Sequence, residues 1–178
     1  YSEILNKQAE HAEYLQEQGR MRQGQAEIVQ SGLGQLALPD LGRSALAILS
    51  KYVPMKVGAL YEYKEDGTLG LFATYGFKDN AELPPEHLRK HEGLIGQVAM
   101  TGDTMQLNDL PETYLRIHSA LGSAPANGIV IIPLKSDGHV NSVMELGFLE
   151  AIPEKHMALL EFIANNLGSA IEATLAKQ

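Results

Sequence analysis

The chain has 178 residues, a formal net charge of −8 from 14 lysines and arginines against 22 aspartates and glutamates, and no cysteine. This length favours one domain with an appendage over two full domains, and the acidic balance argues against a protein that binds nucleic-acid phosphates. The lack of thiols excludes disulfides, thiolate metal sites, cysteine nucleophiles and thioether-linked chromophores, and it favours a cytoplasmic location.

Residues 1–37 are predicted to form a helix that precedes the domain. Glutamine, glutamate, alanine and leucine are frequent there and proline is absent, a composition that favours helix. Alternating steps of four and three residues trace a heptad seam: Tyr1, Leu5, Gln8, Ala12, Leu15, Gly19, Arg22, Ala26, Val29, Leu33 and Leu36. Gln8, Gly19 and Arg22 weaken this seam. Two interpretations stay open: a solvated helix that packs on its own domain, or a parallel dimerisation helix that transmits a conformational signal.

A single domain is predicted over residues 38–178. Asp40 is the expected N-cap of a helix that ends at Val53-Pro54. The later elements are separated by glycines, prolines and polar turns. In chain order they are strands over 57–63 and 69–75, a short helix over 94–100, a short strand over 104–107, a helical patch over 110–121, strands over 129–134 and 140–148, and a helix from 153 onward. The last helix has apolar residues on two faces, which predicts a partner helix in addition to a sheet contact.

The strongest local prediction is a hairpin within residues 124–149. Two runs rich in β-branched residues flank Asp137-Gly138, and both turn residues tolerate a positive φ. Continuous apolar runs indicate strands covered on both faces, so the hairpin is expected in the middle of a sheet. Together the elements predict an α+β fold with a central antiparallel sheet of five or six strands. The terminal helices are expected on one face, and short helices and loops that roof a pocket on the other.

Several short motifs follow one another along residues 38–175. They are Gly58-Ala59-Leu60-Tyr61, Ala73-Thr74-Tyr75-Gly76-Phe77, His91-Glu92-Gly93-Leu94-Ile95-Gly96-Gln97-Val98-Ala99, Pro111-Glu112-Thr113-Tyr114, Ser119-Ala120-Leu121-Gly122, Pro125, Ile131-Ile132-Pro133-Leu134 and Val143-Met144-Glu145-Leu146. As an ordered set they resemble a GAF domain, the small-molecule-sensing module of bacterial sensor kinases and related regulators. The resemblance implies a GAF/PAS-like pocket on one face of the sheet and a role in signal transduction, with a sensor histidine kinase of a two-component system as the expected parent protein. Because the first residue is Tyr1 rather than Met, we expect a segment of a longer protein, with an output domain and any membrane anchor elsewhere.

We expect a ligand to contact one face of the sheet and the segments above it. The candidate residues are Tyr61, Tyr75, Gln97, Tyr114, Ile117, Ser119, Ile129, Ile131, Met144 and Glu145. Tyr61, Ile129, Ile131 and Met144 are equally well explained as sheet core, and Gln97 as an exposed helix residue. A carboxylate inside an apolar strand is costly to bury without a donor, so Glu145 is expected to meet a ligand or a tyrosine hydroxyl, unless the strand is more exposed than its neighbours suggest.

The sequence leaves the identity of the ligand and of any cofactor open. A cyclic nucleotide could use backbone amides near Gly93 or Gly122-Ser123, although few cations lie nearby. Haem could be ligated by His118, and His87 and His91 would share one helical face for a metal ion. A small neutral or amphipathic molecule fits the expected lining better than any of these.

No nucleophile elbow, phosphate loop or kinase motif occurs, so we expect a non-catalytic segment, and we assign no metal ligand. No apolar stretch reaches the roughly 20 residues of a membrane span. The expected partners are a small molecule, a second copy of the chain through the N- and C-terminal helices, and neighbouring signalling domains. The alternative is a ligand-free module that dimerises and relays a signal.

Overall fold

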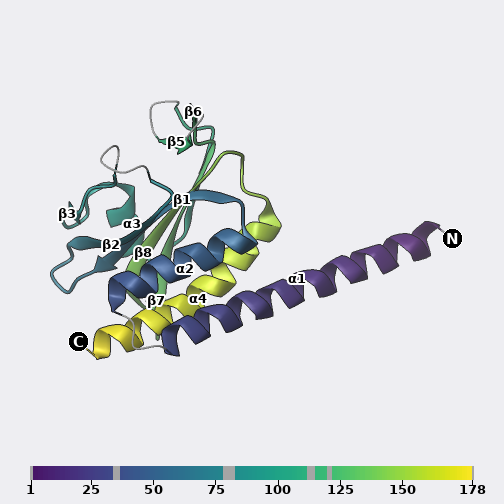
Figure 1. Cartoon of the computed structure of the whole chain (residues 1–178), viewed down its shortest axis with the longest axis horizontal. Coiled ribbons are helices and arrows are strands. Elements are labelled where there is room, and N and C mark those ends of the chain that lie inside the picture. The colour runs from purple at the N-terminus through teal and green to yellow at the C-terminus, as the bar shows by residue number, and fades with distance from the viewer. Residues whose placement is uncertain (1, 34–36, 78–82, 112–114, 120–121, 178) are drawn as a thin grey trace.

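The computed structural model describes residues 2–33, 37–77, 83–111, 115–119 and 122–177 (Figure 1). The helices are α1 (Ser2–Leu33), α2 (Leu38–Tyr52), α3 (Gly93–Thr101) and α4 (Glu154–Ala176). The strands are β1 (Met55–Tyr63), β2 (Leu69–Tyr75), β3 (His87–Leu88), β4 (Met105–Asn108), β5 (Arg116–Ser119), β6 (Gly122–Pro125), β7 (Gly128–Ser136) and β8 (His139–Phe148).

Six strands form one antiparallel sheet in the order β3-β2-β1-β8-β7-β4, while β5 and β6 form a separate two-stranded ribbon. The predicted hairpin is β7–β8, in the interior of the sheet. Ser136 and His139 are register partners, and the two residues between them, Asp137 and Gly138, have φ angles of 52° and 75°. This is the two-residue connection that matches the twist of the flanking strands. The expected α+β fold with an antiparallel sheet is confirmed.

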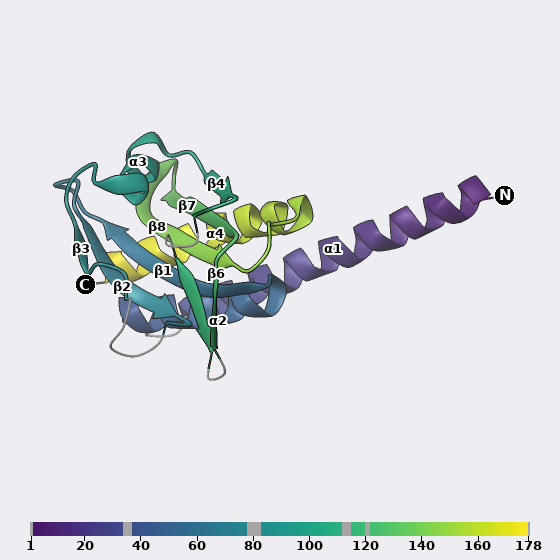
Figure 2. The same cartoon turned by 90° about the horizontal axis from the view of Figure 1, so that it is seen from above.

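Helices α1, α2 and α4 lie together on one face of the sheet (Figure 1, Figure 2). The larger apolar cluster fills the space between them and the strands, and its fully buried members include Leu46, Leu49, Leu60, Val130, Met144, Leu146, Leu160 and Leu167. Helix α4 runs very close to β7: a Cβ added at Gly168 would lie 2.2 Å from the Lys135 carbonyl oxygen. The Asn141 amide of β8 donates a hydrogen bond of 3.0 Å to the Gly168 carbonyl, which ties the helix to the sheet from a second strand.

The partner helix that the two apolar faces of α4 predict is α1 of the same chain. Ile28 of α1 is fully buried. One turn earlier, a Cβ added at Gly24 would lie 2.8 Å from Cδ1 of Ile163 in α4, so glycine lets the two helices approach closely. The Gln25 amide also donates a 3.2 Å hydrogen bond to the side chain of Asn166.

The end of α2 is joined to α1 by a polar cluster centred on Tyr52. The Arg20 guanidinium donates a 2.6 Å hydrogen bond to the Tyr52 carbonyl and lies 5.6 Å from the centre of its ring. The Tyr52 hydroxyl donates to the Glu27 carboxylate, which also accepts from Lys51 at 3.1 Å. Burial and this acceptor raise the pKa of Tyr52 to about 12. The cluster thus attaches α1 to Tyr52, which lies three residues before the start of β1 at Met55.

The N-terminal part of α1 extends beyond the rest of the domain (Figure 1), and the side chains of residues 2–16 are exposed. The predicted heptad seam lies on a different face from the residues that pack on the domain. Leu5, Leu15 and Val29 of the seam are 56%, 55% and 45% exposed. Helix α1 therefore packs on its own domain and still presents a second apolar face.

Three local predictions are wrong. Asp40 does not cap α2: Ala37 occupies the N-cap position, and the Asp40 carboxylate, in the first turn, pairs with Arg43. The described part of the expected helical patch over 110–121 contains β5 rather than helix. His87 lies in β3, and His91 has a φ of 64°, so this histidine pair does not share a helix.

The second face of the sheet is covered by α3, by the segment around β3 and by the β5–β6 ribbon (Figure 1). A smaller apolar cluster lies on this face, with Ala59, Tyr61, Ile129, Ile131 and Val143 among its buried members. Within the described residues, no helix combines the length and apolar character that a membrane span requires.

Candidate functional site

A cavity of about 310 Å³, here called the sheet cavity, lies between this second face and the segments that cover it. Its described lining residues come from β1, β8, the end of β2, β3 and the segment before it, the start of α3 and the approach to β5: Tyr61, Phe77, Pro84, Pro85, Leu88, Glu92, Gly93, Leu94, Ile95, Leu115 and Glu145. The volume is at the lower end of the range for small-molecule sites, about 300–1,000 Å³.

Glu145 lies on the floor of the sheet cavity in β8. Its register partners on the two neighbouring strands are Ala59 and Ile131, which are apolar and buried. Among the hydrogen bonds and ion pairs of the described residues, none involves the Glu145 carboxylate. Burial raises the pKa of this carboxyl because an apolar setting disfavours the charged form. The hydrogen-bond donor that we expect for the Glu145 carboxylate is therefore not found among the described residues.

Tyr61 lies beside it in β1 and links the floor to the wall. Its hydroxyl donates a 2.6 Å hydrogen bond to the Pro85 carbonyl. Burial raises the pKa of Tyr61, and the Glu145 and Glu92 carboxylates raise it further. Since the hydroxyl already donates to Pro85, it is not the donor for Glu145. The neighbouring wall segment is held by a second bond, from the Leu71 amide to the Glu86 carbonyl at 2.8 Å.

Glu92 lies at the mouth of the sheet cavity, immediately before α3. One of its carboxylate oxygens accepts a 3.1 Å hydrogen bond from the Arg89 amide, while the side chain is exposed. The turn that precedes α3 is tight: His91 and Gly93 both have positive φ angles, and a Cβ added at Gly96 would lie 2.6 Å from the His91 carbonyl carbon. Glycine at position 96 therefore lets α3 fold back over this turn, which positions Glu92 at the rim.

The charged side chains in the described lining of the sheet cavity are all negative. Glu92 and Glu145 are its ionisable residues besides Tyr61, and no lysine, arginine or histidine is among them. The remaining lining is apolar, with the aromatic rings of Tyr61 and Phe77 and the aliphatic side chains of Leu88, Leu94, Ile95 and Leu115. Such a site favours ligands that have an apolar body and no negative charge.

The structure separates the sheet residues that the sequence placed in one site. Tyr61 and Glu145 line the cavity. Met144 belongs to the apolar cluster on the helix face, and Tyr75 packs against that same cluster, so both point away from the cavity. Ile129 and Ile131 are buried on the cavity face, beneath the lining residues.

The candidate residues outside the central strands are not among the described residues that line the sheet cavity. Gln97 is exposed on α3, as its alternative interpretation had it. Ile117 is partly buried in β5, and Ser119 ends that strand. Tyr114 lies outside the described residues.

Sequence reasoning missed most of the cavity wall. Pro84, Pro85 and Glu92 line the cavity but are not among the ligand candidates that the sequence analysis gives. Leu88 belongs to a strand of two residues, for which no periodicity can be measured. A usable signal existed in the proline pair, because consecutive prolines hold an extended segment whose carbonyl groups are free to accept hydrogen bonds.

The histidines that the sequence offers as metal or haem ligands lie in strands and turns. No group of three or more potential ligands is found there. His118 lies in the strand β5 rather than in a roof helix.

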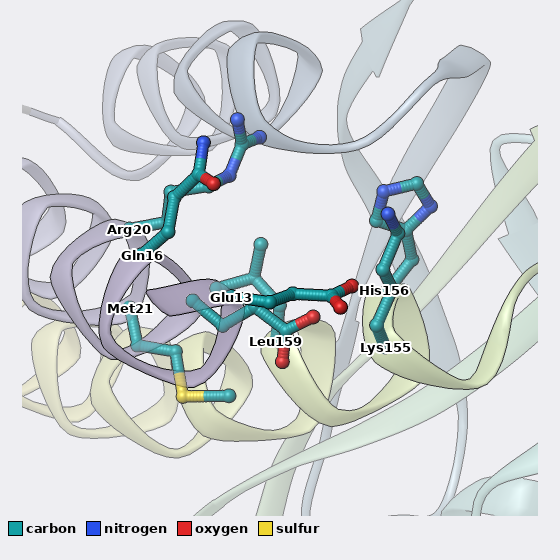
Figure 3. Close-up of a pocket in the computed structure, with 8 residues that line it drawn as sticks. Glu13, Gln16, Arg20, Met21, Lys155, His156 and Leu159 are labelled. Atoms are coloured by element: carbon teal, nitrogen blue, oxygen red, sulfur yellow. The ribbon is translucent and has the colours of Figure 1, made fainter. Parts of the chain in front are cut away.

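A second, smaller cavity of about 180 Å³, here called the helix cleft, lies between α1 and α4 (Figure 3). Its lining consists of Glu13, Gln16, Glu17, Arg20, Met21, Lys155, His156 and Leu159. In Figure 3 the Glu13 carboxylate points across the cleft toward the side chains of Lys155 and His156. Burial and the neighbouring cations Lys155 and Arg20 lower the pKa of His156. Because its walls are long polar side chains of both charges, we favour the sheet cavity as the ligand site.

Comparison with known proteins places this geometry in context. The family model described as "GAF domain" matches residues 35–172. No curated protein sequence gives a significant match. The GAF domain from a phosphoenolpyruvate-protein phosphotransferase of Coxiella burnetii superposes with a TM-score of 0.68 at 23% identity, over 89% of this chain and 96% of that one.

Two further solved structures share the fold at lower identity. A free methionine-R-sulfoxide reductase from Neisseria meningitidis, in complex with its substrate, has a TM-score of 0.66 at 18% identity, over 91% of this chain and 92% of that one. The nlh2 GAF domain of A. aeolicus in an inactive state has a TM-score of 0.65 at 18% identity, over 88% and 98%. Identities this low establish a common fold and leave the ligand open.

Proposed function

The chain belongs to the GAF domain family, and from this premise we propose that it is a sensory domain that binds a small molecule in the sheet cavity and relays the change through its terminal helices. The observation that carries the proposal is the Glu145 carboxylate, which faces a cavity from an apolar strand without a partner among the described residues. The Glu145 side chain is partly buried, so a carboxylate without a donor costs free energy there, and a ligand that pairs with it offsets that cost.

The strands that form the cavity floor also contact the helices on the opposite face. Glu145 shares β8 with Asn141, whose amide donates to the Gly168 carbonyl of α4 and to Glu172 at 3.1 Å. Tyr61 lies in β1, and β1 begins three residues after Tyr52. Tyr52 is the residue to which Arg20 and Glu27 of α1 are hydrogen-bonded. A shift of either strand on ligand binding thus reaches a terminal helix through hydrogen bonds, and a ligand that prefers one arrangement shifts the population toward it.

We expect the signal to leave the domain along α1. Its exposed heptad seam supports a parallel dimer with a second copy, because the seam repeats at coiled-coil spacing and is not used by the domain itself. Such a dimer matches a signalling protein in which neighbouring domains read the helix geometry. A sensor histidine kinase is the parent protein that we propose, and this segment itself is taken to be non-catalytic.

A thermal-shift screen of metabolites against the full chain tests the binding function. A ligand at 100 times its Kd should stabilise the fold by about 2.7 kcal/mol, which raises the Tm by roughly 5–10 °C for a chain of this size. Ile95→Trp should fill the cavity and abolish the shift, whereas Met100→Trp on the exposed side of α3, where the native residue is 54% exposed, should retain it. A broad screen without any shift would count against ligand sensing.

The relay can be measured separately, because the chain has no native cysteine. Cysteines introduced at the exposed positions Gln8 and Glu150 accept spin labels without background. The distance between them should change when a ligand from the screen is added. An unchanged distance distribution at saturation would contradict the relay while leaving binding intact.

The second candidate function is a ligand-free dimerisation and relay module. The exposed seam of α1 favours it, since this face requires no ligand to act. Light scattering of purified chain should then report a dimer that Leu15→Glu disrupts, together with no ligand by native mass spectrometry and no hit in the screen.

A further inference from the structure

The sheet cavity has a chemical preference that can be read from its charges. Glu145 lies on its floor and Glu92 at its mouth, and the described lining contains no cation. Both carboxylates line the same cavity as Tyr61, and after burial they are the causes that raise the pKa of its hydroxyl. A negatively charged ligand group would meet two like charges and no counter-ion among the described residues.

The start of α3 does not reverse this preference. A helix N-terminus carries a partial positive charge that favours anions. Here Glu92 is the N-cap residue of α3, so a negative charge already belongs to this end of the helix, although its carboxylate accepts from the Arg89 amide rather than from the first amides of α3. An anion at the helix start would have to approach that carboxylate.

The walls define the rest of the ligand. Leu88, Leu94, Ile95 and Leu115 provide aliphatic contacts, and Tyr61 and Phe77 provide rings. An ammonium group can donate three hydrogen bonds and has no acceptor, which complements carboxylates and the face of an aromatic ring. The Pro85 carbonyl accepts from Tyr61 and one Glu92 oxygen accepts from the Arg89 amide, so the Glu145 carboxylate is the acceptor in the described lining that has no donor.

We propose that the sheet cavity is selective for a small organic cation, an amine with a compact apolar body, whose ammonium group pairs with Glu145 and is further attracted by the negative charge of Glu92 at the mouth. This inference rests on the proposed sensing function, since it names the ligand class of the same cavity. Charge-assisted hydrogen bonds contribute about 1.5–3 kcal/mol, so the charge should be worth about tenfold to a hundredfold in affinity.

The test is calorimetric titration of the full chain with matched compounds. Butyl, cyclohexylmethyl and 2-phenylethyl bodies are each offered as the amine, the alcohol and the carboxylate. For at least one body the amine should bind about tenfold or more tightly than the alcohol, and the carboxylate should bind more weakly than either. The Glu145→Gln variant preserves shape and hydrogen-bonding capacity, so it should lose the amine preference and keep the affinity for the alcohol.

Two further variants test whether the amine preference comes from charges at the cavity. Glu92→Gln changes an exposed residue, so folding is retained, and it should weaken amine binding severalfold. Glu65→Gln removes the same charge from the exposed turn between β1 and β2 and should leave all affinities unchanged, which separates a local effect from attraction by the net charge of −8.

The possible outcomes test the amine selectivity separately from the proposed binding function. If the alcohols or carboxylates of every body bind as tightly as the amines, or if Glu145→Gln leaves the preference unchanged, charge selectivity is refuted while the cavity remains a ligand site. If none of the nine compounds binds at millimolar concentration, the proposed amine selectivity is refuted, whereas the binding function itself stands or falls with the metabolite screen.

Discussion

Replacement of Gly168 by alanine should destabilise the domain, although alanine normally favours helix. The added Cβ would lie 2.2, 2.6 and 2.8 Å from the carbonyl oxygen, amide nitrogen and carbonyl carbon of Lys135. These are backbone atoms in the central strand β7, which cannot rotate away as a side-chain tip can. Helix α4 must therefore move outward by about 1 Å, a shift comparable to other cases of core overpacking.

The cost follows from two contributions and one offset. Overpacking of a core costs about 1–3 kcal/mol. The shift also stretches the hydrogen bond from the buried Asn141 amide to the Gly168 carbonyl, and an unpaired buried group costs about 1–3 kcal/mol. Alanine recovers about 1 kcal/mol through its helix propensity. We expect a net loss of about 1–5 kcal/mol, with about 3 kcal/mol as the central value, which lowers the Tm by roughly 6–12 °C.

Urea denaturation followed by circular dichroism measures this loss. Gly19→Ala is the matched control, because the glycine is also in a helix but a Cβ there would meet nothing within 4 Å. That variant should be as stable as the wild type or gain up to about 1 kcal/mol. Equal stabilities for the two alanine variants would refute the reasoning, since close backbone approach would then carry no energetic consequence.

Three further predictions concern α1 and the sheet cavity. Ile28→Ala should cost about 2–4 kcal/mol of unfolding free energy because Ile28 is fully buried. Val29→Ala should change the unfolding free energy by less than about 0.5 kcal/mol at concentrations where the chain is monomeric, because Val29 is exposed. Equal losses in urea denaturation would contradict the division of α1 into a buried and an exposed apolar face. Because burial raises the pKa of the Glu145 carboxyl in the folded state, its ionisation costs stability as pH rises above the ordinary value of 4.5. The Glu145→Gln variant should therefore be more stable than the wild type toward neutral pH and equally stable in acid; a pH-independent difference would refute the burial argument. Tyr61→Phe removes the hydrogen bond to Pro85 and should cost about 1–2 kcal/mol, with faster amide exchange in the adjoining wall segment; unchanged exchange would show that this bond does not hold the wall.

The sequence predicted those parts of the fold that depend on neighbouring residues. The β7–β8 hairpin follows from a local turn and two apolar runs, so its position and connection were predictable. The β3 and β5 strands have two and four residues, and they exist only because neighbours pair with them, which no periodicity records. The expected helical patch failed for this reason.

The candidate site illustrates the same limit. Met144 and Glu145 are consecutive in one strand and must face opposite sides of the sheet, so one of the two could have been excluded in advance. Which one faces the cavity depends on where the helices pack. On α1, the residues that contact the domain include Gly24 and Ile28, a stripe with weak apolar character, while the stronger heptad pattern lies elsewhere. Periodicity identified an apolar face correctly but could not say what covers it.

In the relay that we propose, the overhang of α1 would act as a lever arm. Residues 2–16 are exposed, and at 1.5 Å per residue they span about 22 Å beyond the anchored part of the helix. A tilt of only about 5° at the Arg20–Tyr52 fulcrum would displace the far tip by about 2 Å, which is enough to change side-chain interlocking in a coiled coil. Sub-ångström adjustments of β1 can thus become ångström-scale displacements at a distance, without any large rearrangement of the sheet.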